Sequence, residues 1–196
     1  MAACIETVER TNGTSIRGAH VPVCRARHDG RDRESDRVEL NCVGLSSEDS
    51  ELLFTADMDT VNHVMLEGET GAAIRVPVMR MDGMLSGKDV PTLIKIDVEG
   101  HELSVLAGGE STLSDRRVAA VVMEINGSGL RYGVSDEALL SAMEGYGFKP
   151  FSYDHLNRRL GERDARNGNA IFVRDANAVN ERVRAAKRYR LINGSI

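Results

Sequence analysis

Four ionisable residues close together in the chain form the densest group in the sequence that could do acid–base chemistry. They lie at the end of an apolar run: Asp97, Glu99, His101 and Glu102. Two neighbouring carboxyl groups tend to raise one pKa, and such a pair or the histidine could take a proton from a hydroxyl or an amine. The same oxygen-rich set could hold a divalent cation, with His101 as a further ligand. In a structural alternative, Glu99 caps the following helix and Asp97 binds the loop backbone.

A strand, a helix and a second strand are predicted around these residues. The segment 93–98 has the aliphatic and β-branched composition of a strand covered on both faces, and Gly100 permits the sharp turn after it. The spacing of apolar residues predicts a helix over about 101–113, and the segment 118–125 is apolar enough for a second buried strand. A crossover of this length is typical of a right-handed parallel unit in an α/β sheet.

The carboxyl end of the second strand adds candidate residues to the same edge. If the two strands are neighbours, Glu124 lies near Asp97 and Glu99, at the edge where open α/β sheets bind ligands. Arg131 and Tyr132 follow in a glycine-containing loop, where they could face a substrate or simply solvent. This loop fits a dinucleotide-binding fingerprint poorly, because Tyr132 occupies the place of the third glycine.

Shorter patterns complete the predicted fold. Apolar runs and alternating patterns predict five further strands, over 38–43, 51–56, 73–78, 148–153 and 169–173. Apolar residues that share one helical face predict that 2–13 is the end of a helix capped by an Asn-Gly pair. Ser135 is a favoured helix start, Asp82 is expected to cap a short turn of its own, and a terminal helix begins near Ala176.

Composition and charge narrow the classes of protein. At 196 residues, with 41% hydrophobic and 28% charged residues, the chain suits one globular domain. A net charge of −5 disfavours a nucleic-acid partner, because such proteins usually concentrate positive charge. Cys4, Cys24 and Cys42 show no zinc-like spacing and indicate reduced thiols. No apolar run is long enough for a membrane span, so a soluble cytoplasmic protein with no membrane partner is expected.

Two adjacent motifs carry a family resemblance. Lys95-Ile96-Asp97-Val98-Glu99-Gly100-His101-Glu102, followed by Val105-Leu106-Ala107-Gly108-Gly109, resembles the central signature of the FkbM-type methyltransferases, which use S-adenosylmethionine. Similar segments lie at 44–47, 76–82 and 121–125, in the order that the family shows. Together they span roughly 38–173, which is most of the chain.

This resemblance implies a fold and a cofactor. The implied fold is an α/β, Rossmann-like class I methyltransferase sheet, mostly parallel with an antiparallel strand pair at one edge, in a single domain over 1–196. S-Adenosylmethionine is the implied cofactor, and Gly44, Leu45 and Ser46 would border its adenine. The family's opening strand and glycine-containing turn have no counterpart in this sequence, so we expect the domain to be incomplete at its amino terminus.

The resemblance also implies a reaction, namely methyl transfer to an oxygen or nitrogen of a small-molecule or sugar acceptor. Asp97 and Glu99 would position or deprotonate the acceptor, and Glu124 would line the same edge. A catalytically inactive remnant or binding module is the alternative, because half of the cofactor cradle is missing. A metal-dependent hydrolase built on Asp97, Glu99 and His101 is less well supported, since the spacing shows no three clear ligands and no metal is expected. The sequence does not predict the oligomeric state.

Overall fold

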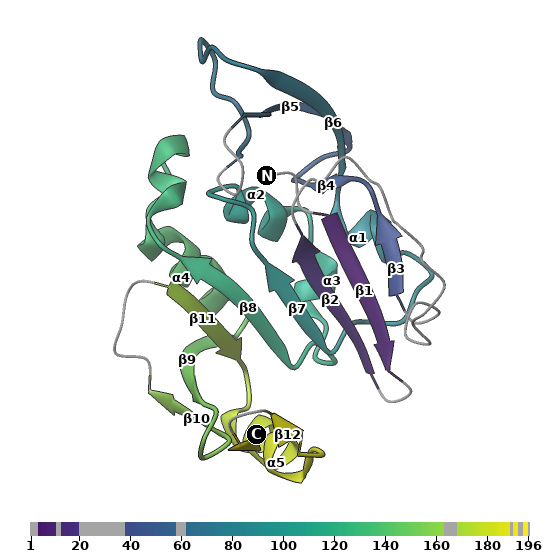
Figure 1. Cartoon of the computed structure of the whole chain (residues 1–196), viewed down its shortest axis with the longest axis vertical. Helices are drawn as coiled ribbons and strands as arrows, with labels where there is room; N and C mark the ends of the chain where they lie inside the picture. Colours follow the sequence, from purple (N-terminus) through teal and green to yellow (C-terminus); the bar gives the residue numbers. More distant parts are fainter. Residues whose placement is uncertain are drawn as a thin grey trace.

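An eight-stranded mixed sheet runs through the structure (Figure 1). The computed structural model describes residues 4–10, 13–19, 38–57, 62–162, 168–188, 190–191 and 194–195. The strand order of this sheet is β10-β9-β11-β8-β7-β2-β1-β3. The strands are β1 (Cys4–Arg10), β2 (Gly13–Ala19), β3 (Val38–Asn41), β7 (Leu93–Ile96), β8 (Ala120–Ile125), β9 (Lys149–Asp154), β10 (Arg159–Glu162) and β11 (Gly168–Val173).

The direction of the strands differs from the prediction. Among the described pairings of this sheet, only β2 with β7 and β7 with β8 are parallel. The other pairings, including β11 with β8 and β11 with β9, are antiparallel. The α/β class and the antiparallel strands at one edge are therefore confirmed, whereas the prediction of a mostly parallel sheet is wrong.

The amino-terminal segment 2–13 was predicted as the end of a helix, and this is wrong for its described residues. They form β1, which pairs antiparallel with β2. The register opposes Arg10 to Gly13, so two residues connect the strands. The β-branched residues on both sides of Gly13 favour strands, and the interpretation of the Asn-Gly pair as a helix cap missed that alternative.

A second sheet of three strands lies beside the first. Its order is β4 (Gly44–Leu45), β6 (Ala73–Met79) and β5 (Ser50–Thr55), with β4 parallel to β6 and β5 antiparallel to it. Strands β5 and β6 extend away from the main sheet, at the top of Figure 1. Phe54, Val76 and Val78 form a small core of their own. A further strand pair, β12 (Arg190–Leu191) with β13 (Gly194–Ser195), lies near the end of the chain.

In the described part of the chain, five short α-helices connect the strands: α1 (Met81–Met84), α2 (Glu102–Ala107), α3 (Glu110–Ser114), α4 (Asp136–Gly145) and α5 (Ala176–Ala185). The helix predicted over 101–113 is thus two helices, separated at Gly108 and Gly109. A Cβ added at Gly108 would lie 2.0 Å from the carbonyl oxygen of Ser46, so that strand-end backbone packs directly on the glycine. The predicted cap of α4 is confirmed, since the Ser135 hydroxyl accepts a hydrogen bond from the Ala138 amide.

The main core lies between α1 to α4 and one face of β7 and β8. Ile94, Ile96 and Val98 are buried and pack with residues of α1 to α4, whereas the alternate positions Lys95 and Asp97 are only half-buried. The expectation that this strand is covered on both faces is therefore met on one face only. The alternation leaves one face of the strand for polar side chains.

Cys42 is disulfide-bonded, so the prediction of three reduced thiols is wrong for this residue. Spacing along the chain could not predict this bond, because it depends on how the fold brings two cysteines together. Within the described residues, no helix combines the length and the apolar character needed to cross a membrane.

Candidate active site

Three carboxylates meet where β7 and β8 end. In the register of this parallel pair Ile96 lies opposite Met123, so the next residues, Asp97 and Glu124, follow side by side. One carboxylate oxygen each from Asp97, Glu99 and Glu124 lies within 4.8 Å of the others, and all three residues are half-buried. The predicted proximity of Glu124 to the two other acids is confirmed. Such an oxygen-rich group can accept protons or attract a cation.

A tight turn over residues 98–101 places Glu99 in this acid group. The His101 amide donates to the Val98 carbonyl at 3.2 Å, and the two central residues have positive φ angles, +51° at Glu99 and +102° at Gly100. These φ values are those of a type I′ turn, in which glycine and asparagine are usual. For residues other than these, the left-handed conformation costs roughly 1–2 kcal/mol of folding free energy. Glu99 therefore sits in an unfavourable backbone conformation, a feature that often marks functional sites.

The acids of this group differ in their electrostatic surroundings. Burial raises the pKa of Glu99, and the neighbouring charges of Glu124 and Asp97 raise it further. Asp97 has an ion-pair partner, because Lys95 Nζ donates to its Oδ2 at 2.6 Å. Glu99 is therefore the carboxylate of the group best suited to accept a proton, while Lys95 orients Asp97. Sequence reasoning missed Lys95, although its spacing of two residues from Asp97 places both on one face of a strand.

His101 connects the turn 98–101, called the acid turn below, to the segment 44–46, which was expected to border a cofactor. Its Nε2 lies 3.1 Å from Ser46 Oγ, within hydrogen-bond distance, and burial lowers its pKa. Its ring meets Tyr132 edge-on, with 6.1 Å between the ring centroids. A neutral His101 held between these two side chains supports the turn more directly than it supports proton transfer, and its catalytic role stays a prediction.

Gly44, Leu45 and Ser46, the segment expected to border the adenine, are buried. Gly44 and Leu45 form β4, and the Ser46 amide donates to the Met79 carbonyl at 3.0 Å. The structure thus places Ser46 next to the acid turn, which a separation of 55 residues concealed in the sequence. Their contact with an adenine stays a prediction.

Arg131 and Tyr132 lie on the short helix η3 (Ser128–Tyr132), which follows β8. Arg131 is exposed, and its charge is close enough to Glu99 to oppose part of the rise in the pKa of that residue. The Tyr132 hydroxyl donates to the Val64 carbonyl at 2.6 Å, so it links η3 to the loop before β6. Arg131 can therefore face a ligand at the acid edge, whereas the hydroxyl of Tyr132 is already used inside the protein.

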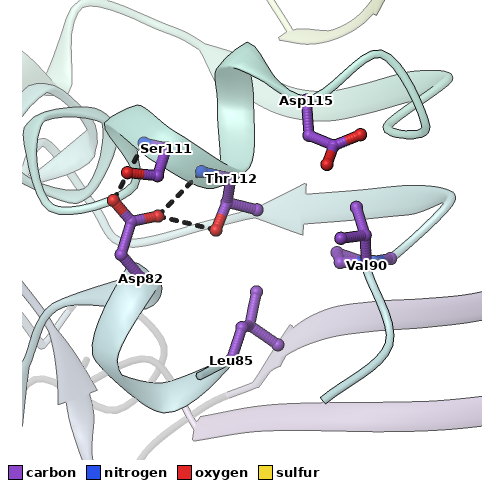
Figure 2. Close-up of a pocket in the computed structure, with 7 residues that line it drawn as sticks. Asp82, Leu85, Val90, Ser111, Thr112 and Asp115 are labelled. Carbon is purple, nitrogen blue, oxygen red and sulfur yellow. Dashed lines mark hydrogen bonds between the residues drawn. The ribbon is translucent and has the colours of Figure 1, made fainter. Parts of the chain in front are cut away.

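A cavity of about 280 Å³ lies at the other end of β7 (Figure 2). Its lining includes Asp82 and Asp115, and both carboxylates have internal partners. Asp82 accepts hydrogen bonds from the amides of Ser111 and Thr112 at 2.9 and 2.8 Å, and Asp115 is paired with Arg117. Asp82 therefore caps α3. The prediction that it caps its own turn is wrong. The acid group at the carboxyl end of β7 remains the better candidate site, because its carboxylates face one another.

An α/β chain whose acids gather at the carboxyl ends of parallel strands has the arrangement of an α/β enzyme at its ligand edge. Residues 19–150 match the model of the methyltransferase FkbM domain, so this chain belongs to the FkbM methyltransferase family. Among solved structures, the chain is similar to the crystal structure of methyltransferase FkbM from Methylobacillus flagellatus KT. That similarity has 15% sequence identity and a TM-score of 0.41, and it covers 70% of this chain and 28% of that one. The comparison with curated proteins finds no significant match.

Proposed function

We propose that this chain is a methyltransferase domain that transfers a methyl group from S-adenosylmethionine to an oxygen or nitrogen of a small-molecule or sugar acceptor. The family to which the chain belongs supports the reaction. The observation that carries the site is the group of Asp97, Glu99 and Glu124, in which Glu99 has a raised pKa. The net charge of −5 agrees with a small acceptor better than with an anionic polymer.

The chemistry of these side chains fits a cationic methyl donor. S-Adenosylmethionine, when bound, supplies a methyl group on a positively charged sulfur. Asp97, Glu99 and Glu124 would attract that charge, since their carboxylates are half-buried and close together. Residues 44–46 would border the adenine, and Ser46 is already hydrogen-bonded to His101 at the acid turn.

The residues of the chain would contribute orientation and proton transfer. Asp97, held by Lys95, would accept a hydrogen bond from the acceptor and align it for an in-line attack on the methyl carbon. Glu99 would take the proton from the attacking hydroxyl or amine as the new bond forms. Arg131 would bind a polar group of the acceptor from the exposed side of the site.

The parallel strands β2, β7 and β8 support a Rossmann-like interpretation of this domain. In such sheets the ligand lies outside the carboxyl ends of the parallel strands, which is where the acid group is located. We propose that these three strands are the counterpart of the central strands of a class I methyltransferase.

Calorimetric titration with S-adenosylhomocysteine tests the cofactor, and product formation with a panel of sugars, alcohols and amines tests the reaction. We expect binding by the wild-type chain and a loss of turnover of about 100-fold or more in Glu99→Gln, since a general base contributes at least about that factor. Glu144→Gln, an exposed carboxylate on α4, is the matched control and should keep wild-type turnover.

Two results contradict the proposal in different ways. Absence of heat at millimolar S-adenosylhomocysteine would indicate a remnant that has lost the cofactor. Binding together with unchanged turnover in both Asp97→Asn and Glu99→Gln would show that the chemistry takes place elsewhere in the protein.

A further inference from the structure

Glu102 is a buried carboxyl group with no role in the steps above. Its exposed fraction is 2%, which places it among the most buried side chains of the described chain. Oε1 accepts a hydrogen bond from the Gly100 amide at 3.1 Å, whereas Oε2 has no hydrogen-bond partner among the described residues. A carboxyl group is costly at such a position, and an apolar side chain would pack there without that cost. Its hydrogen bond to the turn is the feature that an apolar residue could not replace.

The hydrogen bond from Glu102 reaches the turn that carries Glu99. Gly100 is held on two sides: its amide points to Glu102, and the position of a Cβ would be 2.7 Å from the Ser128 carbonyl oxygen and 2.9 Å from the Tyr132 ring. The contact with η3 restricts where the turn can move. The hydrogen bond fixes the direction of the peptide between Glu99 and Gly100.

This peptide determines where the Glu99 side chain points. Glu99 has a φ of +51°, and relaxation to the ordinary negative range would rotate its side chain away from the present direction. The carboxylate would then leave the neighbourhood of Asp97 and Glu124.

We propose that Glu102 is a positioning residue for methyl transfer, which holds the turn 98–101 so that the Glu99 carboxylate stays in the acid group. This inference rests on the proposed function of that group. Burial raises the pKa of Glu102, and the nearby charge of Glu99 raises it as well, so the site favours an uncharged carboxyl. A glutamine keeps the accepting oxygen and the shape without a charge, and it should replace Glu102 well. A leucine of similar size lacks the acceptor.

The test compares Glu102→Gln with Glu102→Leu in the full chain. We expect Glu102→Leu to lower kcat about 10-fold or more with the KM for S-adenosylmethionine changed by less than about 3-fold, because a misplaced catalytic group affects mainly the chemical step. Exchange of the Gly100 amide, followed by NMR, should become faster by a similar factor. Glu102→Gln should restore both quantities to near wild-type values. Glu102→Met serves in the same way if Glu102→Leu does not fold.

A double mutant separates positioning from general destabilisation. If Glu102 acts through Glu99, the kcat of the double mutant Glu99→Gln/Glu102→Leu should lie within about 2-fold of the kcat of Glu99→Gln. Multiplicative losses in the double mutant overturn the proposal, as does an equal loss of kcat in Glu102→Gln and Glu102→Leu. If the wild-type chain neither binds S-adenosylhomocysteine nor turns over, the proposed function fails and this role fails with it. Slower Gly100 exchange in Glu102→Gln than in Glu102→Leu would still show, in that case, that Glu102 holds the turn.

Discussion

Glu99 combines an unfavourable backbone conformation with an unfavourable electrostatic position. Its φ is +51°, and burial together with the charges of Glu124 and Asp97 raises its pKa. Both features oppose stability, so neither is explained by folding alone. The simplest account is that the position of this carboxylate matters for the chemistry.

Replacement of Glu99 by glycine should therefore stabilise the protein and inactivate it. Glycine removes roughly 1–2 kcal/mol of left-handed strain and adds about 0.5–1 kcal/mol of chain entropy to the unfolded state, so a net gain of about 0.5–1 kcal/mol is expected in urea unfolding. Turnover should fall as in Glu99→Gln. Gly100→Ala is the control in the opposite direction. It should cost about 2 kcal/mol or more, because its φ is +102° and its Cβ would meet the Ser128 backbone.

The raised pKa of Glu99 also predicts how stability changes with pH. Because the folded-state pKa lies above the unfolded value, the stabilising contribution of this group is fully present below the unfolded pKa. It is lost as the pH rises through the folded pKa. Glu99→Gln should thus gain Tm relative to wild type as the pH rises from about 4 to about 7. A difference in Tm that stays constant or shrinks over this range would show that Glu99 is not destabilised by its surroundings.

At the scale of single residues, the acid group was predictable and its supports were not. Asp97, Glu99 and Glu124 were found because side chains alternate along strands and parallel strands end at one edge. The bond between Ser46 and His101 spans 55 residues, so no local pattern could indicate it. The buried state of Glu102 depends on tertiary packing, which also leaves no signal in the sequence.

Among the elements, α3 shows how a side chain distant in sequence can start a helix. Its N-cap residue is Gly109, which has no side chain to cap the helix. Asp82, in α1, accepts the hydrogen bonds from the first amides of α3 instead. Thr112 also donates its hydroxyl to Asp82 at 2.6 Å. Burial tends to raise the pKa of Asp82, but these hydrogen bonds outweigh it and lower the pKa.

Asp82→Ala should remove this cap at a cost of about 1–2 kcal/mol at neutral pH. Because the folded-state pKa is lowered, the contribution of Asp82 is present above the unfolded pKa and is lost as the pH falls through the folded pKa. The difference between Asp82→Ala and wild type in urea unfolding should therefore narrow below about pH 4. Asp89→Ala, which removes an exposed carboxylate nearby, should be almost neutral. A gap that does not depend on pH would contradict a role for the ionised cap.

Elements with strong local patterns were predicted well, and the errors have tertiary causes. The runs that became β7 and β8 and the Ser135 start of α4 were correct because composition and capping act locally. The helix over 101–113 breaks at Gly108, where the Ser46 backbone leaves no room for a Cβ. The hairpin of β1 and β2 was missed because a few apolar residues matched the helical period by chance.

In the whole molecule, the three-stranded sheet is linked to the main sheet around the candidate site. Tyr132 donates to the Val64 carbonyl, and Ser46, which follows β4, contacts His101. These bonds join residues far apart in the chain. Movement of the small sheet would therefore disturb the acid turn.

Tyr132→Phe should loosen this link while it keeps the ring against His101. Loss of one hydrogen bond should cost about 1 kcal/mol. In hydrogen exchange, the amides of residues 62–69 should exchange faster in Tyr132→Phe than in wild type. The amides of β8 should change less. Tyr153→Phe, at an exposed position, should change neither stability nor exchange. Equal exchange of 62–69 in Tyr132→Phe and wild type would show that other contacts hold the two sheets together.

The pairing of Ile96 with Met123 has one further consequence. Since side chains alternate along a strand, insertion of a single residue in the connection before β8 that shifted this alignment by one place would turn Glu124 into the apolar layer and bring Met123 or Ile125 to the open side. An insertion of two would preserve the orientation. Insertions of an even number of residues at that point should therefore preserve activity better than insertions of an odd number, although the segment contacts no ligand.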